Sequence, residues 1–219
     1  MRIRITFAKQ GALRYTGNLD LHKMWERTAR RADLALSYSQ GFHPQPKMQL
    51  AAALPLGFAS SCELIDIRID DRVELDTLPE RLQGAVPPGL KILKVEEIDE
   101  ASPPLQTQVI AAEYVVTFYP VHDRQGVGEE LDQARLSQSL DTVNGAESLP
   151  RERRGKPYDL KTLIEDLRQI EPDAEGRPRI LMRLTAIPAA TGRPEELLDA
   201  LGIVYEGTRV ERTKFIFRE

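Results

Sequence analysis

The fold is decided around residues 41–69, which read GFHPQPKMQLAAALPLGFASSCELIDIRI. Pro44 and Pro46 fix φ and remove two backbone donors, so this part excludes a helix and disfavours a sheet interior. Residues 48–54 then place an apolar side chain at every second position, and residues 64–69 do the same. Such alternation is typical of strands with one buried face. The stretch therefore predicts a stiff loop followed by an antiparallel hairpin.

The segment before this stretch contains one strand and one helix. Apolar and polar residues alternate over 3–7, which predicts a strand. Residues 19–32 have helical spacing, with Asn18 as the expected N-cap and Trp25 in the apolar stripe. The opposite face of this helix is mostly basic. Its residues are His22, Lys23, Glu26, Arg27, Arg30 and Arg31.

Residues 78–83 predict a second short helix, and residues 90–95 predict a further strand. The resulting order of strand, helix, strand, strand, helix and strand is that of a split βαβ, or ferredoxin-like, unit. In such a unit two helices cover one face of a four-stranded antiparallel sheet, and the other face can stay open.

The pattern repeats after a Pro-Pro linker. Strands are expected over 111–119, 179–188 and 210–217, and helices over 128–140 and from Pro194 to Gly202. Residues 160–170 have apolar side chains at helical spacing, yet the turn at 172–176 favours a hairpin with the strand that follows. We predict a strand there, because two repeated units then account for the whole chain.

The expected fold class is therefore α+β, with two tandem ferredoxin-like (βαββαβ) units and antiparallel sheets. The first domain covers residues 1–103 and carries the basic helix and the Gly-Phe-His-Pro loop. The second, divergent unit covers residues 104–219.

Composition limits the classes of function. The 219 residues are 41% hydrophobic and carry a net charge of −4, as in ordinary globular proteins. One cysteine, Cys62, is too few for a disulfide framework, a zinc ribbon or a self-contained iron–sulfur cluster. The start of the chain alternates instead of forming the apolar region of a signal peptide, and no apolar run approaches the length of a membrane span. We expect a cytoplasmic protein with no membrane partner, no metal and no cofactor bound by this chain.

Charge is distributed unevenly along the chain. Residues 1–50 contain nine Lys and Arg against three Asp and Glu, hence a local net charge of +6. Arginine grips phosphate bidentately and stacks on bases, so these residues predict an anion-binding or RNA-binding surface, with a solvated face as the alternative. A second basic cluster, around Gly155, is expected to be a flexible loop that becomes ordered on a polyanion, with a merely solvated loop as the alternative. The candidate binding residues are Lys9, Arg14, Arg27, Arg30, Arg31, Phe42, His43, Lys47, Arg153, Arg154 and Lys156.

Two residues of the loop have alternative interpretations. Phe42 either stacks on a base or anchors the loop in the core, and we favour the anchor. His43 has no neighbouring histidine or carboxylate in the sequence, so it predicts a local hydrogen bond, with a general acid–base role as the alternative. No phosphate loop, dinucleotide motif or His-Glu-x-x-His motif is present, and Gly126-Val127-Gly128 is too short to count as one. We therefore predict no catalytic residue.

Several strings in the chain match those of a known family, and the string over residues 39–47 is specific to it. They are Ser39-Gln40-Gly41-Phe42-His43-Pro44, Pro46-Lys47-Met48, Leu54-Pro55-Leu56-Gly57, Arg154-Gly155-Lys156 and Arg193-Pro194-Glu195-Glu196. With these strings the chain resembles the radical-SAM-linked (radical-SAM-associated) bacterial family of unknown function, DUF2344. The family usually has histidine where this chain has Asn18, and a basic residue or histidine where it has Gln45. Asparagine cannot titrate near neutral pH, so no proton shuttle is expected at position 18.

The resemblance implies a radical SAM protein as the partner. The iron–sulfur cluster and S-adenosylmethionine are then expected on that partner only. The leading hypothesis is an accessory binding protein that presents an anionic substrate such as RNA to the separate radical SAM enzyme. The alternatives are a metal-independent RNA-processing enzyme that uses His43, and a purely protein-binding scaffold.

Overall fold

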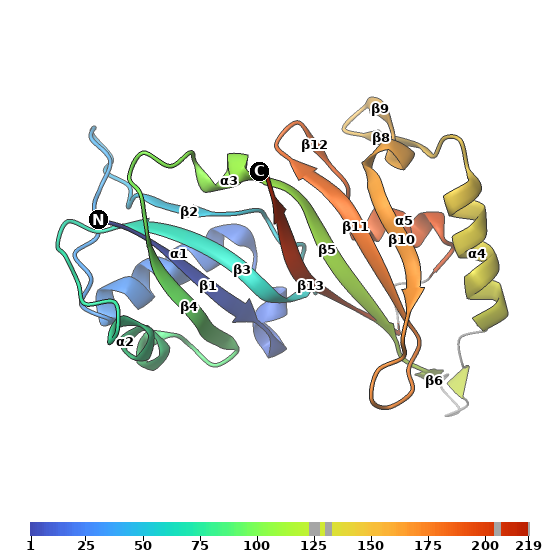
Figure 1. The fold of residues 1–219 in the computed structure, drawn as a ribbon, viewed down its shortest axis with the longest axis horizontal. Helices are drawn as coiled ribbons and strands as arrows, with labels where there is room; N and C mark the ends of the chain where they lie inside the picture. Colours follow the sequence, from blue (N-terminus) through green and yellow to red (C-terminus); the bar gives the residue numbers. More distant parts are fainter. Residues whose placement is uncertain (123–127, 130–132, 204–206, 219) are drawn as a thin grey trace. The chain divides into compact units, whose positions relative to one another are not determined.

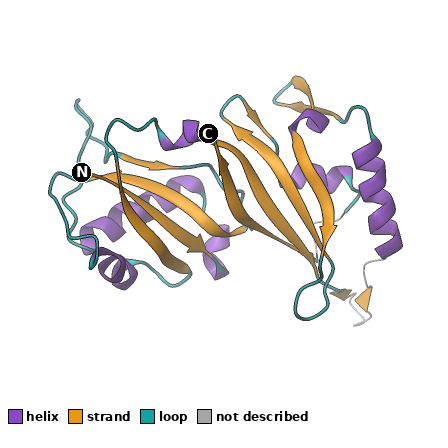
Figure 2. Cartoon of the chain, in the orientation of Figure 1, coloured by secondary structure: helices purple, strands orange, loops and turns teal. Residues whose placement is uncertain are grey.

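The computed structural model describes residues 1–122, 128–129, 133–203 and 207–218. It divides into two compact units, one of Met1–Val109 with Arg218 and one of Ile110–Phe217. Each unit contains helices and mostly antiparallel strands (Figure 2), so the predicted α+β class is confirmed. The predicted domains 1–103 and 104–219 stay a prediction, because compactness alone does not show that each part folds by itself.

The first unit has its strands and helices in the predicted order (Figure 1). Its sheet has the order β4-β1-β3-β2, and every pair in it is antiparallel. The elements are β1 (Arg2–Lys9), the 3-10 helix η1 (Gly11–Tyr15), α1 (Asn18–Arg31), β2 (Met48–Leu50), β3 (Ala59–Arg68), α2 (Leu78–Ala85), β4 (Leu90–Ile98) and α3 (Leu105–Gln108).

The core of the first unit lies between the sheet and the helices α1 and α2. Ile3, Ile5 and Phe7 of β1 are fully buried, as their alternation predicts. Trp25 of α1 is also fully buried and meets the Phe7 ring edge-on, with 4.8 Å between ring centroids. The apolar stripe of α1 is therefore core, as predicted.

Asn18 is not the N-cap of α1. Gly17 takes that position in an extended conformation, and Asn18 is the first helical residue. A cap without a side-chain acceptor satisfies the first amides of the helix less well than asparagine would.

The second unit has the sheet order β10-β11-β5-β13. Its elements are β5 (Val109–Phe118), β6 (Val121–His122), β7 (Gly128–Glu129), α4 (Gln133–Gly145), β8 (Pro150–Arg153), β9 (Lys156–Asp159), the 3-10 helix η2 (Leu160–Leu163), β10 (Ile164–Ile170), β11 (Arg179–Ile187), β12 (Ala190–Thr191), α5 (Pro194–Ala200) and β13 (Thr208–Phe217). Of the helix predicted over 128–140, the first two residues form a strand, residues 130–132 lie outside the described residues, and the helix continues to Gly145. Residues 126 and 127 of the short glycine motif also lie outside them.

The strand predicted over residues 160–170 is confirmed for Ile164–Ile170, which pairs with β11. Leu160 and Leu163 are buried in the short helix η2, and Leu167 is buried in the strand opposite Met182. The apparent helical spacing over residues 160–170 thus arises because one turn of 3-10 helix is followed directly by an edge strand. Pairing with β11 overrides the local pattern.

Candidate functional site

The loop between α1 and β2 is closed at its base by backbone contacts. The Lys47 amide donates to the Ser37 carbonyl (2.8 Å), and the Ser39 amide donates to the Gln45 carbonyl (2.8 Å). The Gln45 amide in turn donates to Ser39 Oγ at 2.9 Å. We call Ser37–Lys47 the neck loop, because these bonds join its two limbs and leave residues 40–44 exposed at the tip.

Helix α1 supports the neck loop from one side. Arg30 Nη2 donates to the Tyr38 hydroxyl at 2.9 Å and to Glu26 at 2.7 Å. Two turns closer to the start of the helix, His22 Nε2 lies 3.3 Å from the Met48 carbonyl oxygen. The hydrogen bond to Tyr38 and the charge of Glu26 raise the pKa of Arg30. Arg30 is therefore engaged in positioning the loop.

Phe42 is 101% exposed, so the interpretation that it anchors the loop in the core is wrong. No signal in the sequence separates the two placements, because an aromatic residue between polar neighbours is compatible with either. His43 beside it is also exposed and makes no hydrogen bond to another residue in the described part of the chain, so the prediction of a local hydrogen bond is wrong. The tip thus presents an aromatic ring and an imidazole on a short, pinned loop.

The predicted basic set of the first unit does not form one surface. Arg27 and Arg31 are exposed on α1, and within the described ranges neither makes a hydrogen bond or ion pair through its side chain. Lys9 is 1% exposed and donates to the Thr16 carbonyl at 2.9 Å. Arg14 lies over the Tyr15 ring, 4.8 Å from its centroid, and donates to its hydroxyl. Of the predicted basic set of the first unit, the side chains that remain available to an anion are those of Arg27 and Arg31 on α1 and of Lys47 at the base of the neck loop, which is exposed.

The second basic cluster is a β-hairpin, so the expectation of a flexible loop is wrong. Strands β8 and β9 pair antiparallel through a two-residue turn, with positive φ at Arg154 (52°) and Gly155 (75°). Such turns match the twist of the flanking strands and favour glycine at the second position. Arg154 and Lys156 are exposed at or beside the turn.

Arg153 of this hairpin is held by the second unit itself. Its Nη2 lies 2.6 Å from Glu196 Oε2, and its guanidinium lies 4.9 Å from the centroid of the Tyr158 ring. The Tyr158 hydroxyl donates to the same Glu196 oxygen at 2.5 Å. Burial lowers the pKa of Arg153, but the contacts with Glu196 and Tyr158 outweigh it and raise that pKa. Arg153 therefore stabilises the fold and is not available as an anion contact.

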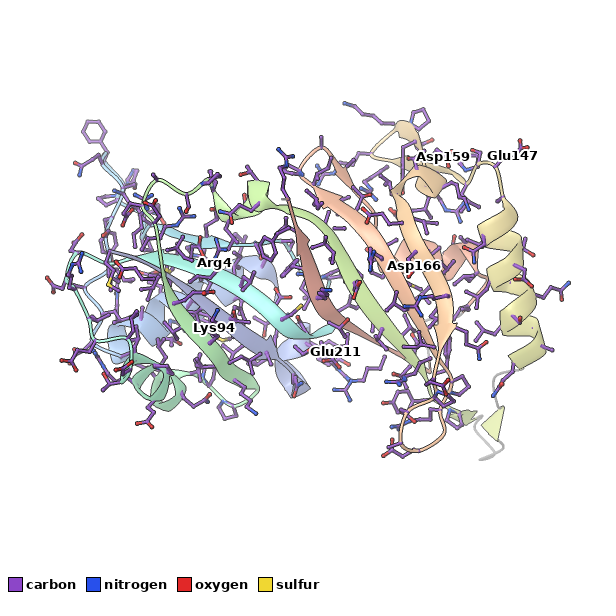
Figure 3. All side chains as sticks on the ribbon, viewed as in Figure 1. Arg4, Lys94, Glu147, Asp159, Asp166 and Glu211 are labelled. Carbon is purple, nitrogen blue, oxygen red and sulfur yellow. The ribbon has the colours of Figure 1, made fainter. Side chains whose placement is uncertain are left out.

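The face of the first sheet that points away from α1 and α2 carries charged residues that the sequence patterns did not single out. Arg2 and Arg4 of β1 both make salt bridges to Asp66 of β3, each with an N···O distance of 2.7 Å. Figure 3 labels Arg4, which lies over the sheet of the first unit. Alternation in the sequence placed these residues opposite the core, but only the register of β1 against β3 brings them together.

The described residues give no sign of a metal centre or of a membrane span. Among residues 1–122, 128–129, 133–203 and 207–218, no group of three His, Cys, Asp or Glu is placed to hold a metal ion. In the same residues, no helix is both long enough and apolar enough to cross a bilayer.

The chain is similar to solved structures at low sequence identity, and the first of them shares its fold. One chain of a Cbf5–Nop10–Gar1 complex matches with a TM-score of 0.50 and 11% identity, covering 97% of this chain. This chain spans 48% of the length of that one. The Thermus thermophilus protein Cse3, solved bound to an RNA, matches with a TM-score of 0.20 and 11% identity over 96% of this chain and 99% of its own. No curated protein matches.

A family model described as "Uncharacterized protein conserved in bacteria (DUF2344)" matches residues 2–194. The match includes the neck loop and the β8–β9 hairpin. The chain therefore belongs to the DUF2344 family.

Proposed function

We propose that this protein is an accessory binding protein that presents RNA to a separate radical SAM enzyme. The observation that carries the proposal is the fully exposed Phe42 ring at the tip of the neck loop. An exposed aromatic side chain costs solvation free energy unless a partner covers it. Because the neck is closed by hydrogen bonds, little conformational freedom is lost when a ligand covers the tip.

RNA is the partner that suits this combination of groups. Single-stranded nucleic acid binds by stacking bases on aromatic rings while cations follow the phosphates. Arg27 and Arg31 are exposed on α1, the helix that supports the neck loop through Arg30 and Tyr38. Their guanidinium groups are free to bind phosphate bidentately.

We also propose that both units are ferredoxin-like. The order β4-β1-β3-β2 of the first sheet and the order β13-β5-β11-β10 of the second put the equivalent strands in the same places. The radical SAM partner is proposed from the family resemblance. In this proposal the partner alone carries the iron–sulfur cluster and S-adenosylmethionine, and both proteins act in the cytoplasm.

The test is RNA binding by the full chain, measured by fluorescence anisotropy with a labelled single-stranded RNA at several salt concentrations. We expect saturable binding that weakens steeply with salt, because bound cations release counterions from the RNA. Absence of binding at low salt would end the RNA proposal and favour a protein-binding scaffold. Co-purification of the tagged protein with a radical SAM protein tests the partner.

The same RNA tests the catalytic alternative. His43 has no described acid, base or nucleophile bonded to it, so we expect no new RNA ends after incubation with the wild type. We expect His43→Ala to weaken RNA binding by about tenfold or less, as for one lost hydrogen bond. Cleavage by the wild type that His43→Ala abolishes would replace the binding proposal with an RNA-processing enzyme.

A further inference from the structure

The face of the first sheet that points away from α1 and α2 contains a cavity of about 410 Å³, lined by residues of β1, β2 and β3, by Lys47 at the base of the neck loop and by the segment before α3. This size falls in the range of small-molecule sites, roughly 300–1,000 Å³. The residues that carry its chemistry are Arg2, Lys47, Gln49, Asp66, Arg68 and Ser102.

Arg2 and Arg4 leave an excess of buried positive charge beside this cavity. Both guanidinium groups make their salt bridges to the single carboxylate of Asp66. The side chains of Arg2, Arg4 and Asp66 are only 5%, 11% and 4% exposed. A charge removed from water is costly unless an opposite charge compensates it. Two cations sharing one anion therefore favour a further anion close to them.

Rigid contacts hold Arg2 at the wall of the cavity. Its Nη1 donates to the Ser102 carbonyl at 2.7 Å, and its Nη2 donates to the Pro103 carbonyl at 3.0 Å. Gln49 also lines the cavity, and its Oε1 accepts a hydrogen bond from the Leu105 amide at 2.8 Å. That bond fixes the Gln49 amide and leaves its Nε2 hydrogens for a ligand.

Lys47 is a cation at the same cavity whose side chain is not engaged. Its backbone is fixed, because its amide donates to Ser37 and its carbonyl accepts from Arg68 at 3.0 Å. No hydrogen bond or ion pair joins its ammonium group to another residue of the described ranges. Arg68, by contrast, pairs with Glu100 at 3.0 Å. Lys47 can therefore reach a ligand in the cavity without giving up a partner.

The lining has a net charge of +2, from Arg2, Lys47 and Arg68 against Asp66. Adding Arg4 and Glu100, which pair with lining residues, leaves that value unchanged. A phosphate monoester carries a charge of about −1.5 to −2 near pH 7 and has three strong acceptor oxygens. This charge and these acceptors match the cavity better than a singly charged carboxylate does.

We propose that this cavity, the phosphate pocket, binds a phosphate monoester. The group is supplied either by a free 5′-nucleotide or by the 5′ end of an RNA. Binding of a free nucleotide in this pocket does not depend on the RNA proposal. Only binding of an RNA 5′ end rests on that proposed function.

The first experiment measures binding of AMP, inorganic phosphate and adenosine to the full chain by isothermal titration calorimetry. We expect AMP and inorganic phosphate to bind saturably and adenosine not to bind. Lys47→Met should weaken AMP binding by about tenfold, as for one lost charge-assisted hydrogen bond. Lys91→Met is the matched control, because Lys91 is exposed on β4 at the opposite edge of the sheet. Equal AMP affinity of Lys47→Met and the wild type would overturn the assignment.

The second experiment separates the two sources with one RNA sequence that carries either a 5′-phosphate or a 5′-hydroxyl. If the RNA end is the ligand, the phosphate should tighten binding by about tenfold, and Lys47→Met should remove only that gain. If both RNAs bind equally well and AMP binds in the first experiment, the ligand of the pocket is a free nucleotide. No binding of AMP or phosphate, together with equal binding of both RNAs, refutes the pocket. RNA binding that still depends on Phe42 would keep the proposed function intact in that case.

Discussion

The neck loop of the first unit and the β8–β9 hairpin of the second are both short projections with basic residues, but their side chains are used differently. In the hairpin, whose two strands pair through their backbone, side chains are engaged as well: Arg153 joins Glu196 and lies over the Tyr158 ring. In the neck loop, the two limbs are joined by hydrogen bonds that the backbone amides of Ser39, Gln45 and Lys47 donate. The aromatic ring and imidazole at its tip are left exposed.

The difference shows which cations and aromatic groups remain for a ligand. A guanidinium that is already paired with a carboxylate and lies over an aromatic ring must lose both contacts to bind a ligand. The net gain in binding free energy is therefore small. A tip that the backbone holds in place binds at a smaller entropic cost, since its side chains have no partners to lose. We therefore expect the hairpin residues to determine stability and the loop residues to determine affinity.

The largest effect is expected for Glu196→Ala in the hairpin contact. The variant removes the carboxylate that accepts hydrogen bonds from both Arg153 and the Tyr158 hydroxyl in a partly buried site. We expect the free energy of unfolding to fall by about 2 kcal/mol, between the values for exposed and fully buried ion pairs. Urea denaturation measures this. Glu152→Ala, at an exposed position of the same hairpin, is the control and should change stability little. RNA affinity should be unchanged, and a clear loss of it would contradict the division of roles.

The next effect is expected for Phe42→Ala in the neck loop. One stacked base contributes about 1–3 kcal/mol, so the variant should bind single-stranded RNA at least about fivefold more weakly. Its stability should equal that of the wild type, because the ring contributes no burial. Leu93→Ala, which removes another exposed apolar side chain from β4, should leave affinity unchanged. Unaltered RNA affinity of Phe42→Ala would show that the exposed ring serves another partner.

A smaller effect is expected on the salt dependence of RNA binding, and it should differ between the exposed cations of the two units. Changing both Arg27 and Arg31 to alanine should flatten the salt dependence of RNA binding, by about 0.7 in the logarithmic slope for each phosphate that the protein no longer neutralises. The paired change of Arg154 and Lys156 to alanine at the hairpin should leave the slope near that of the wild type. A larger change from the hairpin pair would move the RNA surface to the second unit.

The smallest effect is a pH dependence of stability that involves Tyr158. Burial raises the pKa of Tyr158, and its hydrogen bond to Glu196 raises that pKa further. The unfolded tyrosine, with a pKa of about 10, then loses its proton before the folded one. The stabilisation is complete below that pH and is lost as pH rises through the folded pKa. Urea denaturation between pH 8 and pH 11 should therefore show a steeper loss for the wild type than for Tyr158→Phe. Parallel curves would mean that Tyr158 titrates alike in both states.

Local patterns in the sequence determined the elements and the core. Alternation over residues 3–7 placed Ile3, Ile5 and Phe7 on the buried face, and helical spacing placed Trp25 against them. The Pro-rich loop was also predictable, since proline removes the donors that a helix or sheet needs. These features depend on the period of a single segment and on intrinsic properties of its residues. The strand at Ile164–Ile170 already required a pairing partner to override its local pattern.

Only the tertiary structure decided which charged groups are compensated and which are available. Arg2, Arg4 and Asp66 meet because the register sets Arg4 opposite Asp66, and Gln49 joins them because β2 pairs with the same strand. Likewise, Arg153 and Lys47 look equivalent in the sequence, yet one lies against Glu196 and the other lines an open cavity. A shift of one residue in any strand pair would turn these side chains to the other face of the sheet. Charge compensation therefore depends on contacts between distant segments, and local sequence patterns do not specify them.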